Sequence, residues 1–185
     1  MKNLTKAFFD DEDIFFAYKT APGAVSLHHA YVGGLAVHTL GVMKLSYEFA
    51  NLYNTINRDL LLVAALFHDI GKTIENSWDL TFRRTNEGEL VGHLIYSRDI
   101  LKSLLSNVEL DYNLALNLEH CILSHHGQYD FGSPKLPMTR EAFALHIADL
   151  SDSRFEEFDK LLEPILPGQS TEPVRFLENR RLFKL

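Results

Sequence analysis

The sequence is poor in the features that mark secreted and membrane proteins. Its 185 residues include one cysteine, Cys121, which excludes an internal disulfide and fits a reducing cytosol. The longest apolar run, residues 60–67, is far shorter than the roughly 20 residues that span a bilayer. In residues 1–16, acids follow directly on the first apolar residues, which is the wrong order for a signal peptide. We therefore expect a cytoplasmic protein with no membrane partner.

Basic residues are also few. The chain has 18 lysines and arginines against 25 aspartates and glutamates, a net charge of -7 at pH 7, and no basic face is evident. A protein that binds duplex nucleic acid normally has such a face. Because a divalent metal can supply positive charge locally, the balance favours a small or short phosphate ester that is bound at one site.

The chain also lacks repeats, low-complexity tracts and long linkers. Its length, with 46% hydrophobic and 23% charged residues, is typical of one globular domain, which we place at residues 1–185. The patterns are almost all helical, so the predicted fold class is all-α, a compact helical bundle. The expected helices cover about residues 4–18, 29–53, 57–71, 90–106, 112–125 and 139–162.

Residues with known end preferences mark several of these helices. Asn57 and Thr139 can cap helix starts with their side-chain oxygens. The run 60–67 is apolar all round and is therefore expected to be buried. Gly71 suits a left-handed stop at the end of the same helix.

Three stretches are expected to depart from long helices. Residues 74–88 hold a weak alternation at 80–82, which favours a short hairpin or an extended lid. The loop 127–137 contains two prolines and two glycines and should be ordered by turns. The tail from Thr171 is expected to form a short strand or helix that packs back on the body.

Histidine, in contrast, is abundant, with nine residues in the chain. Seven potential metal ligands lie mostly at the ends or on one face of predicted helices: His38, His68, Asp69, His93, His125, His126 and Asp149. Imidazole and carboxylate together suit first-row transition metals such as manganese, iron, cobalt, nickel or zinc rather than calcium.

The adjacent pair His68 and Asp69 is central to this pattern. Consecutive helical residues point about 100° apart, so both reach one metal only near a helix end. A carboxylate can bridge two cations held about 3.5–4 Å apart, the geometry for in-line phosphoryl displacement. For the pair alone, a hydrogen-bonded helix end is the simpler interpretation. The five further ligands favour a two-metal centre.

The order of these ligands resembles the HD-domain superfamily of metal-dependent phosphohydrolases. Six stretches are similar, more narrowly, to the YhaM-type 3′→5′ exoribonucleases: residues 28–39, 66–72, 87–93, 122–127, 131–137 and 177–181. The resemblance covers nearly the whole chain and implies an HD-type bundle that hydrolyses phosphate esters. Those enzymes also carry an N-terminal OB-fold domain, which supplies stacking platforms for single strands and has no counterpart in this sequence.

The resemblance implies two divalent metal ions. It assigns one to His38, His68, Asp69 and Asp149. It assigns the other to Asp69, His93, His125 and His126. A metal-activated hydroxide would be the nucleophile, with Asp69 and Lys72 as catalytic residues. From its position alone, Lys72 is equally well explained as a solvated lysine near a helix end; the resemblance favours charge stabilisation on the phosphate.

Three residues are predicted to contact substrate. His29, like its neighbour His28, precedes a helix and either contacts phosphate or serves in capping and packing. Arg154 is a candidate phosphate clamp, and Lys135 offers a second cation from the 127–137 loop.

Three other polar residues are interpreted as structural. His120 is turned away from the ligand face, and Asp152 is expected to be a surface or ion-pair residue. His146 is expected to be a buried histidine with satisfied hydrogen bonds, or one that supports a metal ligand.

The predicted function is that of a phosphodiesterase or 3′→5′ exoribonuclease-like enzyme acting on short single-stranded RNA or DNA or on nucleotides. A homo-oligomer or a separate RNA-binding partner could supply further nucleic-acid surface. The alternatives are a nucleotide phosphomonoesterase, an HD-type di-iron oxygenase and a non-enzymatic nucleotide-binding module. A non-enzymatic module would be expected to have lost at least one metal ligand, whereas this sequence has a suitable residue at every expected ligand position.

Overall fold

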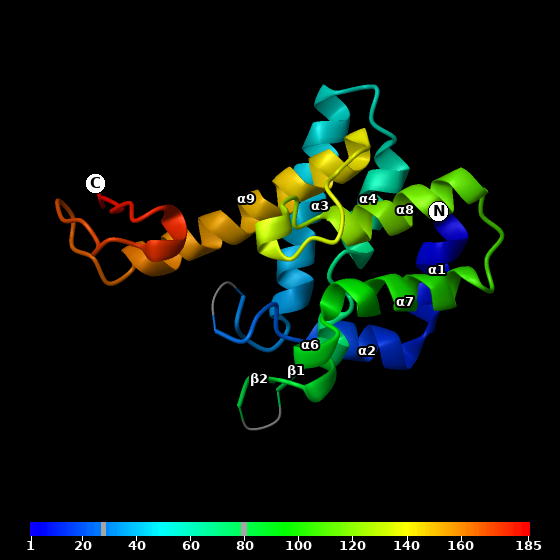
Figure 1. Ribbon diagram of the computed structural model, residues 1–185, viewed down its shortest axis with the longest axis horizontal. Helices are drawn as coiled ribbons and strands as arrows, with labels where there is room; N and C mark the ends of the chain where they lie inside the picture. Colours follow the sequence, from blue (N-terminus) through cyan, green and yellow to red (C-terminus); the bar gives the residue numbers. More distant parts are fainter. Residues whose placement is uncertain (27–28, 79–80) are drawn as a thin grey trace.

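Two long helices, α3 (Gly34–Leu52) and α9 (Arg140–Leu162), pack against each other at the centre of the molecule (Figure 1). The computed structural model describes residues 1–26, 29–78 and 81–185. The other α-helices are α1 (Lys2–Asp10), α2 (Glu12–Thr20), α4 (Arg58–Phe67), α5 (Lys72–Glu75), α6 (Asn86–Leu90), α7 (His93–Leu105) and α8 (Tyr112–Ser124). The smaller elements are β1 (Asn76–Ser77), β2 (Arg83–Arg84) and the 3-10 turns η1 (Tyr129–Phe131) and η2 (Arg175–Leu177).

These elements confirm the predicted all-α class. Within the described ranges, the only sheet is the antiparallel pair β1 and β2, in which Asn76 pairs with Arg84 and Ser77 with Arg83. No helix in the described ranges is both long and apolar enough to cross a membrane.

Helix α4 is the most deeply buried element, and His68 and Asp69 directly follow its last residue. It packs against α3, α8 and α9, and its side chains from Val63 to Phe67 are all buried, as the all-round apolar run predicts. Phe67 packs edge-on against Phe8 of α1, with ring centroids 5.4 Å apart. Burial of each such side chain stabilises the fold by about 1.5–3 kcal/mol. The helix therefore holds the residues that directly follow it in a rigid interior position.

Two predicted caps are confirmed. Asn57 Oδ1 accepts a hydrogen bond from the Leu60 amide at 3.1 Å, and Thr139 Oγ1 accepts one from Ala142 at 3.2 Å. Both satisfy an amide that the first turn of a helix leaves without an intrahelical partner.

The predicted helices 4–18 and 29–53 have different bounds. Asp11 divides the first into α1 and α2, because its carboxylate accepts from the Ile14 amide at 3.0 Å and so caps a new helix. The second begins at Gly34, since His29 and Gly33 have φ of 51° and 83° and form turns. His28 and Leu80, both named in the sequence predictions, lie outside the described residues.

The prediction for residues 74–106 is correct in part. The short hairpin forms as β1 and β2, but the following stretch holds the additional helix α6, which Thr85 caps by accepting from Gly88. The predicted helix 90–106 is broken at Gly92, whose φ of 82° is incompatible with a continuous right-handed helix. The loop 127–137 is ordered by turns, as expected, with φ of 76° at Gly127 and 80° at Gly132.

The left-handed stop predicted at Gly71 is wrong. Gly71 has φ −62° and ψ −16°, ordinary right-handed values. A glycine is needed there for a different reason: a Cβ would lie 2.2 Å from the His93 carbonyl oxygen and 2.5 Å from the Ser97 amide nitrogen. The missing side chain lets the start of α7 approach the end of α4, and Gly71 donates to Ser97 Oγ at 2.8 Å.

The tail does not pack back on the helical body. It folds on itself through bridges of Ser170 with Phe183 and of Val174 with Arg180. Lys184 Nζ then donates to the Leu162 carbonyl at the end of α9, at 3.0 Å. Figure 1 shows this end of α9 projecting from the body, so the tail meets the helix tip instead of the core.

Candidate metal centre

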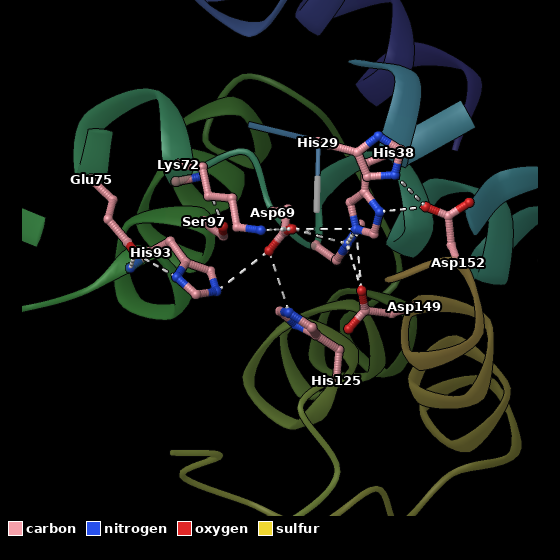
Figure 2. Close-up of polar contacts among 12 residues, drawn as sticks. His29, His38, Asp69, Lys72, Glu75, His93, Ser97, His125, Asp149 and Asp152 are labelled. Carbon is pink, nitrogen blue, oxygen red and sulfur yellow. Dashed lines mark hydrogen bonds and ion pairs between the residues drawn. The ribbon is translucent and has the colours of Figure 1, made fainter. Parts of the chain in front are cut away.

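Five helices deliver polar side chains to one interior position. The seven predicted ligands come from within α3, the end of α4, the start of α7, the end of α8 and the middle of α9: His38, His68, Asp69, His93, His125, His126 and Asp149. Figure 2 shows His38, His93 and His125 turned toward Asp69 from three sides. Residues far apart in the chain therefore converge as the predicted constellation requires.

Asp69 lies between two sets of histidines and presents one oxygen to each. Its Oδ2 is 3.5 Å from His38 Nε2 and 3.4 Å from His68 Nε2. Its Oδ1 is 3.4 Å from both His93 Nε2 and His125 Nε2. One carboxylate facing two ligand sets is the arrangement that a bridging ligand of a two-metal site needs.

Asp149 and His126 extend the two sets. Asp149 Oδ1 lies 3.2 Å from His38 Nε2 and 3.8 Å from His68 Nε2. His126 Nε2 lies 3.1 Å from His93 Nε2 on the other side of Asp69. Ligand atoms of His38, His68 and Asp149 are all within 4.8 Å of one another, as are those of His93, His125 and His126.

The hydrogen bonds of the rings set their tautomers. Three rings direct Nδ1 to a backbone carbonyl at 2.8 Å, namely His68 to Ala65, His125 to Ile122 and His126 to Phe131. A carbonyl only accepts, so each of these Nδ1 atoms carries the hydrogen. In the neutral ring, Nε2 then presents a lone pair toward the centre.

Two further rings direct Nδ1 to a carboxylate. His38 Nδ1 lies 2.7 Å from Asp152 Oδ2. His93 Nδ1 contacts Glu75 Oε2, and the His93 amide donates to the same oxygen at 2.6 Å. A carboxylate behind a histidine fixes the ring and raises its basicity as a metal ligand. Each of the two ligand sets contains one such pair.

The chemistry of this centre fits a cation. Among the described residues, Asp69 Oδ1 and His125 Nε2 are buried polar atoms with no hydrogen-bond partner. A buried, unsatisfied polar atom costs about 1–3 kcal/mol. Two acceptors that face each other across 3.4 Å repel unless positive charge lies near both. The residues present therefore suit divalent metal ions, and the donor set suits transition metals.

Most groups at the centre are held in the form that binds a cation. Burial alone would raise the pKa of Asp69, but Lys72 and His68 outweigh it and hold that pKa well below its usual value. Burial, aided by His125, lowers the pKa of His126 to about 3. Burial likewise lowers the pKa of His125. The acid is thus charged and these imidazoles are neutral at pH 7, as metal binding requires.

His38 differs because carboxylates surround it. Burial would lower its pKa, but hydrogen bonds to Asp149 and Asp152 raise it to about 9. In the absence of a cation, a proton is therefore held where Asp149 meets His38.

Lys72 extends from α5 toward the same carboxylate. Its Nζ lies 2.6 Å from Asp69 Oδ2, and the residue is 9% exposed. Burial would lower the pKa of Lys72, but the attraction of Asp69 outweighs it and raises that pKa. The ammonium group is therefore charged and lies at the edge of the centre, as Figure 2 shows.

A cavity of about 370 Å³ opens beside the centre. Its lining includes Asp69, His93 and Asp149 together with three cations, Lys72, Arg84 and Arg154. Arg154 Nη1 donates to Glu157 Oε2 at 2.7 Å, which orients the guanidinium at the cavity wall. The predicted phosphate clamp is thus within reach of a ligand in the cavity.

The other two predicted substrate residues do not line this cavity. His29 is 6% exposed, and its Nε2 lies 3.0 Å from Asp152 Oδ2, so it faces the carboxylate behind His38. Lys135 lies in the 127–137 loop near His120, whose pKa falls through burial and through the lysine's charge. The His29 ring is instead engaged by Asp152, on the Nδ1 side of His38.

Glu75 was not predicted from the sequence, and Asp152 was predicted to be a surface or ion-pair residue. Both lie behind a histidine of the centre, and their spacing offers a signal. Asp152 lies three residues after Asp149, hence on the same face of α9. Glu75 follows Lys72 by three residues in α5. An acid one turn after a predicted site residue is therefore a candidate for such a supporting role.

Two histidines have the structural roles that were predicted. His120 Nε2 accepts from the Met138 amide at 2.9 Å, on the outer side of α8. His146 is buried, and its Nδ1 donates to the His125 carbonyl at 2.8 Å. It therefore braces the turn that carries His125 and His126.

Comparisons with known proteins agree with this geometry. The family model described as "HD domain" matches residues 35–153. The chain is 36% identical over 184 residues to the 3′-5′ exoribonuclease YhaM of Listeria innocua, covering 99% of this chain and 58% of that protein. It is 40% identical over 163 residues to that of Bacillus subtilis, covering 88% and 52%.

The chain spans about half the length of the curated relatives it matches. No solved structure matches it. The family model covers more than half of the chain and includes the whole run of candidate ligands from His38 to Asp149. This chain belongs to the HD domain family.

Proposed function

We propose that this chain is a metal-dependent phosphodiesterase, a 3′→5′ exoribonuclease-like enzyme that hydrolyses short single-stranded oligonucleotides or nucleotides in the cytoplasm. One observation carries the proposal: the buried Asp69 presents each of its two oxygens to a different set of histidine Nε2 atoms. The relatives named above, which are exoribonucleases by name, support the substrate class.

Two divalent metal ions fit this proposal, with manganese, iron, cobalt, nickel and zinc as the candidates. The first would be held by His38, His68, Asp69 and Asp149. The second would be held by Asp69, His93, His125 and His126. Bound divalent ions lower the pKa of a water molecule toward neutrality and withdraw charge from phosphate oxygens.

The protein's own residues then have distinct tasks. Asp152 and Glu75 keep the rings of His38 and His93 oriented and their Nδ1 atoms protonated. Lys72, charged and next to Asp69, is placed to stabilise negative charge that develops on the phosphate. Arg154, at the cavity wall, is placed to bind a neighbouring phosphate through its guanidinium. We assign no substrate contact to His29 or Lys135.

The charge distribution supports a short substrate. The net charge is -7, and the basic residues that line the cavity are Lys72, Arg84 and Arg154. Positive charge is therefore local to the site, whereas a long groove for many phosphates would need a basic stripe. We propose that residues 1–185 act as one catalytic unit, to which a second copy or a separate RNA-binding chain would add surface for longer RNA.

Metal analysis of the purified protein, combined with a substrate panel, tests this function. We expect two ions per chain and manganese-dependent hydrolysis of bis(p-nitrophenyl) phosphate and of short RNA labelled at its 5′ end. RNA shortened stepwise from the 3′ end would support the polarity.

Other outcomes would overturn the proposal. Hydrolysis of p-nitrophenyl phosphate without hydrolysis of the diester would show a phosphomonoesterase. Oxygen uptake by an iron-loaded form that lacks hydrolytic activity would show an oxygenase. Two bound metals with no turnover of any ester in the panel would show a binding module.

A further inference from the structure

The cavity beside the candidate metal centre continues past His93 and His126 into a second hollow of about 340 Å³. The two hollows share five lining residues: Glu75, Arg84, His93, His126 and Phe131. They therefore form one groove, with the proposed second ligand set at the junction.

The two halves of this groove differ in chemistry. The half beside Asp69 and Asp149 holds the charged groups, among them Lys72 and Arg154, next to uncharged residues such as Val25 and Leu150. Among the residues that the structure describes, those that line only the other half are all uncharged: Gly88, Val91, Gly92, Leu94, Ile95, Gly132 and Pro134. A ligand that fills both halves would thus need a charged part joined to an uncharged, largely apolar part.

Two glycines line the uncharged half with backbone alone. Gly92 and Gly132 have φ of 82° and 80°, and a Cβ at either position would meet no atom within 4 Å. The space over them is free, so a flat group could approach the backbone closely. Val91 and Ile95 add apolar surface that is 46% and 38% exposed.

Phe131 lies at the junction with its position fixed. The residue lines both halves and is 47% exposed. Its carbonyl oxygen accepts from His126 Nδ1 at 2.8 Å, and its amide donates to the Gln128 carbonyl at 3.1 Å. The backbone of Phe131 thus orients a proposed metal ligand and is itself held next to the centre.

We propose that the uncharged half of the groove binds the nucleobase of the nucleotide whose phosphate occupies the charged half, with Phe131 as the stacking surface. This inference rests on the proposed function and names the substrate part that the site recognises. A nucleobase has planar faces that stack on aromatic rings, and every base has such a face. Arg84, at the junction and with its side chain 53% exposed, would lie near the sugar-phosphate link.

The lining also indicates how selective this subsite is. Within the described part of the chain, the residues unique to the uncharged half carry no polar side chain, and the polar residues of this hollow all lie at the junction. Discrimination between bases requires hydrogen bonds to their edges. Stacking alone tolerates all bases. We therefore infer that the enzyme accepts purines and pyrimidines with similar efficiency.

A pair of chromogenic diesters tests the subsite. The p-nitrophenyl ester of thymidine 5′-monophosphate carries a base, and methyl p-nitrophenyl phosphate does not, while both release the same leaving group. The quantity measured is the ratio of their kcat/KM values. Stacking on an aromatic ring contributes about 1–3 kcal/mol per base, so Phe131→Ala should lower this ratio roughly 5- to 150-fold. Phe131→Trp should keep the ratio close to that of the wild type.

Tyr129 offers a matched control, because it belongs to the same 3-10 turn and is 64% exposed but lines neither hollow. Tyr129→Ala should leave the ratio unchanged. Metal content, measured on each variant, should equal that of the wild type.

The remaining outcomes are decisive. If Phe131→Ala lowers both kcat/KM values equally, or leaves their ratio unchanged, the base subsite is wrong even though the proposed function stands. If the wild type hydrolyses neither diester, the proposed function itself fails. Tight binding of an apolar peptide in the groove, without competition from thymidine monophosphate, would assign the groove to a protein partner and overturn the inference.

Discussion

Gly41 and Asp152 approach each other so closely that a methyl group on Gly41 would lie 1.8 Å from Oδ1 of the Asp152 carboxylate. The carboxylate is held at its other oxygen, where Oδ2 lies 2.7 Å from His38 Nδ1 and 3.0 Å from His29 Nε2. A glycine in the interior of α3 thus makes room for the carboxylate that orients His38, a proposed metal ligand. The same relation recurs at Gly88, where a Cβ would lie 2.9 Å from Glu75 Cγ.

Gly41→Ala should therefore weaken metal binding. In an ordinary helix interior this change stabilises by about 0.5–1 kcal/mol, but here the alanine must displace Asp152. Loss of a group that supports a metal ligand typically costs 10–100-fold in metal affinity, and we expect a loss of about that size in a manganese titration. Asp152→Asn should have a similar effect. The double variant should be little worse than either single one, and additive losses would show that Gly41 does not act through Asp152.

Asp69→Ala should release both metal ions and abolish hydrolysis. Its two oxygens face both ligand sets, so one substitution removes a ligand from each. Elemental analysis after gel filtration measures the metal content directly. Asp59→Ala, at an exposed position at the start of α4, is the control and should keep two ions. A variant without Asp69 that retains both ions would refute the bridging role.

Lys72→Ala should separate chemistry from metal binding. The ammonium group supplies charge beside Asp69 but is not itself a metal ligand. We expect metal content to stay at the wild-type level while kcat falls by about 10²–10³, the effect of losing one donor that stabilises the transition state. Lys44→Ala, at an exposed position of α3, should change neither. An unaltered kcat in the Lys72 variant would show that this residue has a structural role only.

Metal ions should also stabilise the fold, because the centre joins five helices. A ligand at 100 times its Kd stabilises by about 2.7 kcal/mol, which for a chain of this size raises Tm by roughly 5–10 °C. Calorimetry of the chelator-treated protein, with and without added manganese, measures this shift. Asp69→Ala should show no such response. An equal response in both proteins would place the binding site elsewhere.

Much of the site could be predicted from residue types and spacing. His38, His68 and the other proposed ligands differ from core residues in chemistry, so their pattern can be recognised in the sequence alone. The acids behind them do not, since an aspartate or glutamate one turn along a helix is usually solvated. Asp152 acquires its role only because α3 lacks a side chain at Gly41, a contact between residues more than a hundred positions apart.

The fold shows the same division between local and distant causes. Asn57 and Thr139 act through hydrogen bonds within one helical turn, and both caps were predictable. Gly71 was misinterpreted because its requirement comes from the approach of α7, not from its own backbone angles. The tail likewise depends on a distant contact, between Lys184 and the end of α9.

Cys121 should be inert in the folded protein. Burial raises the pKa of its thiol to about 12, and the residue has no exposed surface. Only the thiolate reacts with disulfide reagents, and an unfolded cysteine has a pKa of about 8.5. We expect no reaction with a chromogenic disulfide at pH 8 in buffer, and one thiol per chain in denaturant. Rapid labelling of the native protein would mean that α8 opens on the time scale of the assay and that the core around Ile122 is not rigid.

The raised pKa of Cys121 also affects stability. The folded state holds the thiol proton more tightly than the unfolded state, so the contribution of this thiol to the free energy of unfolding is complete below pH 8.5 and declines as pH rises toward 12.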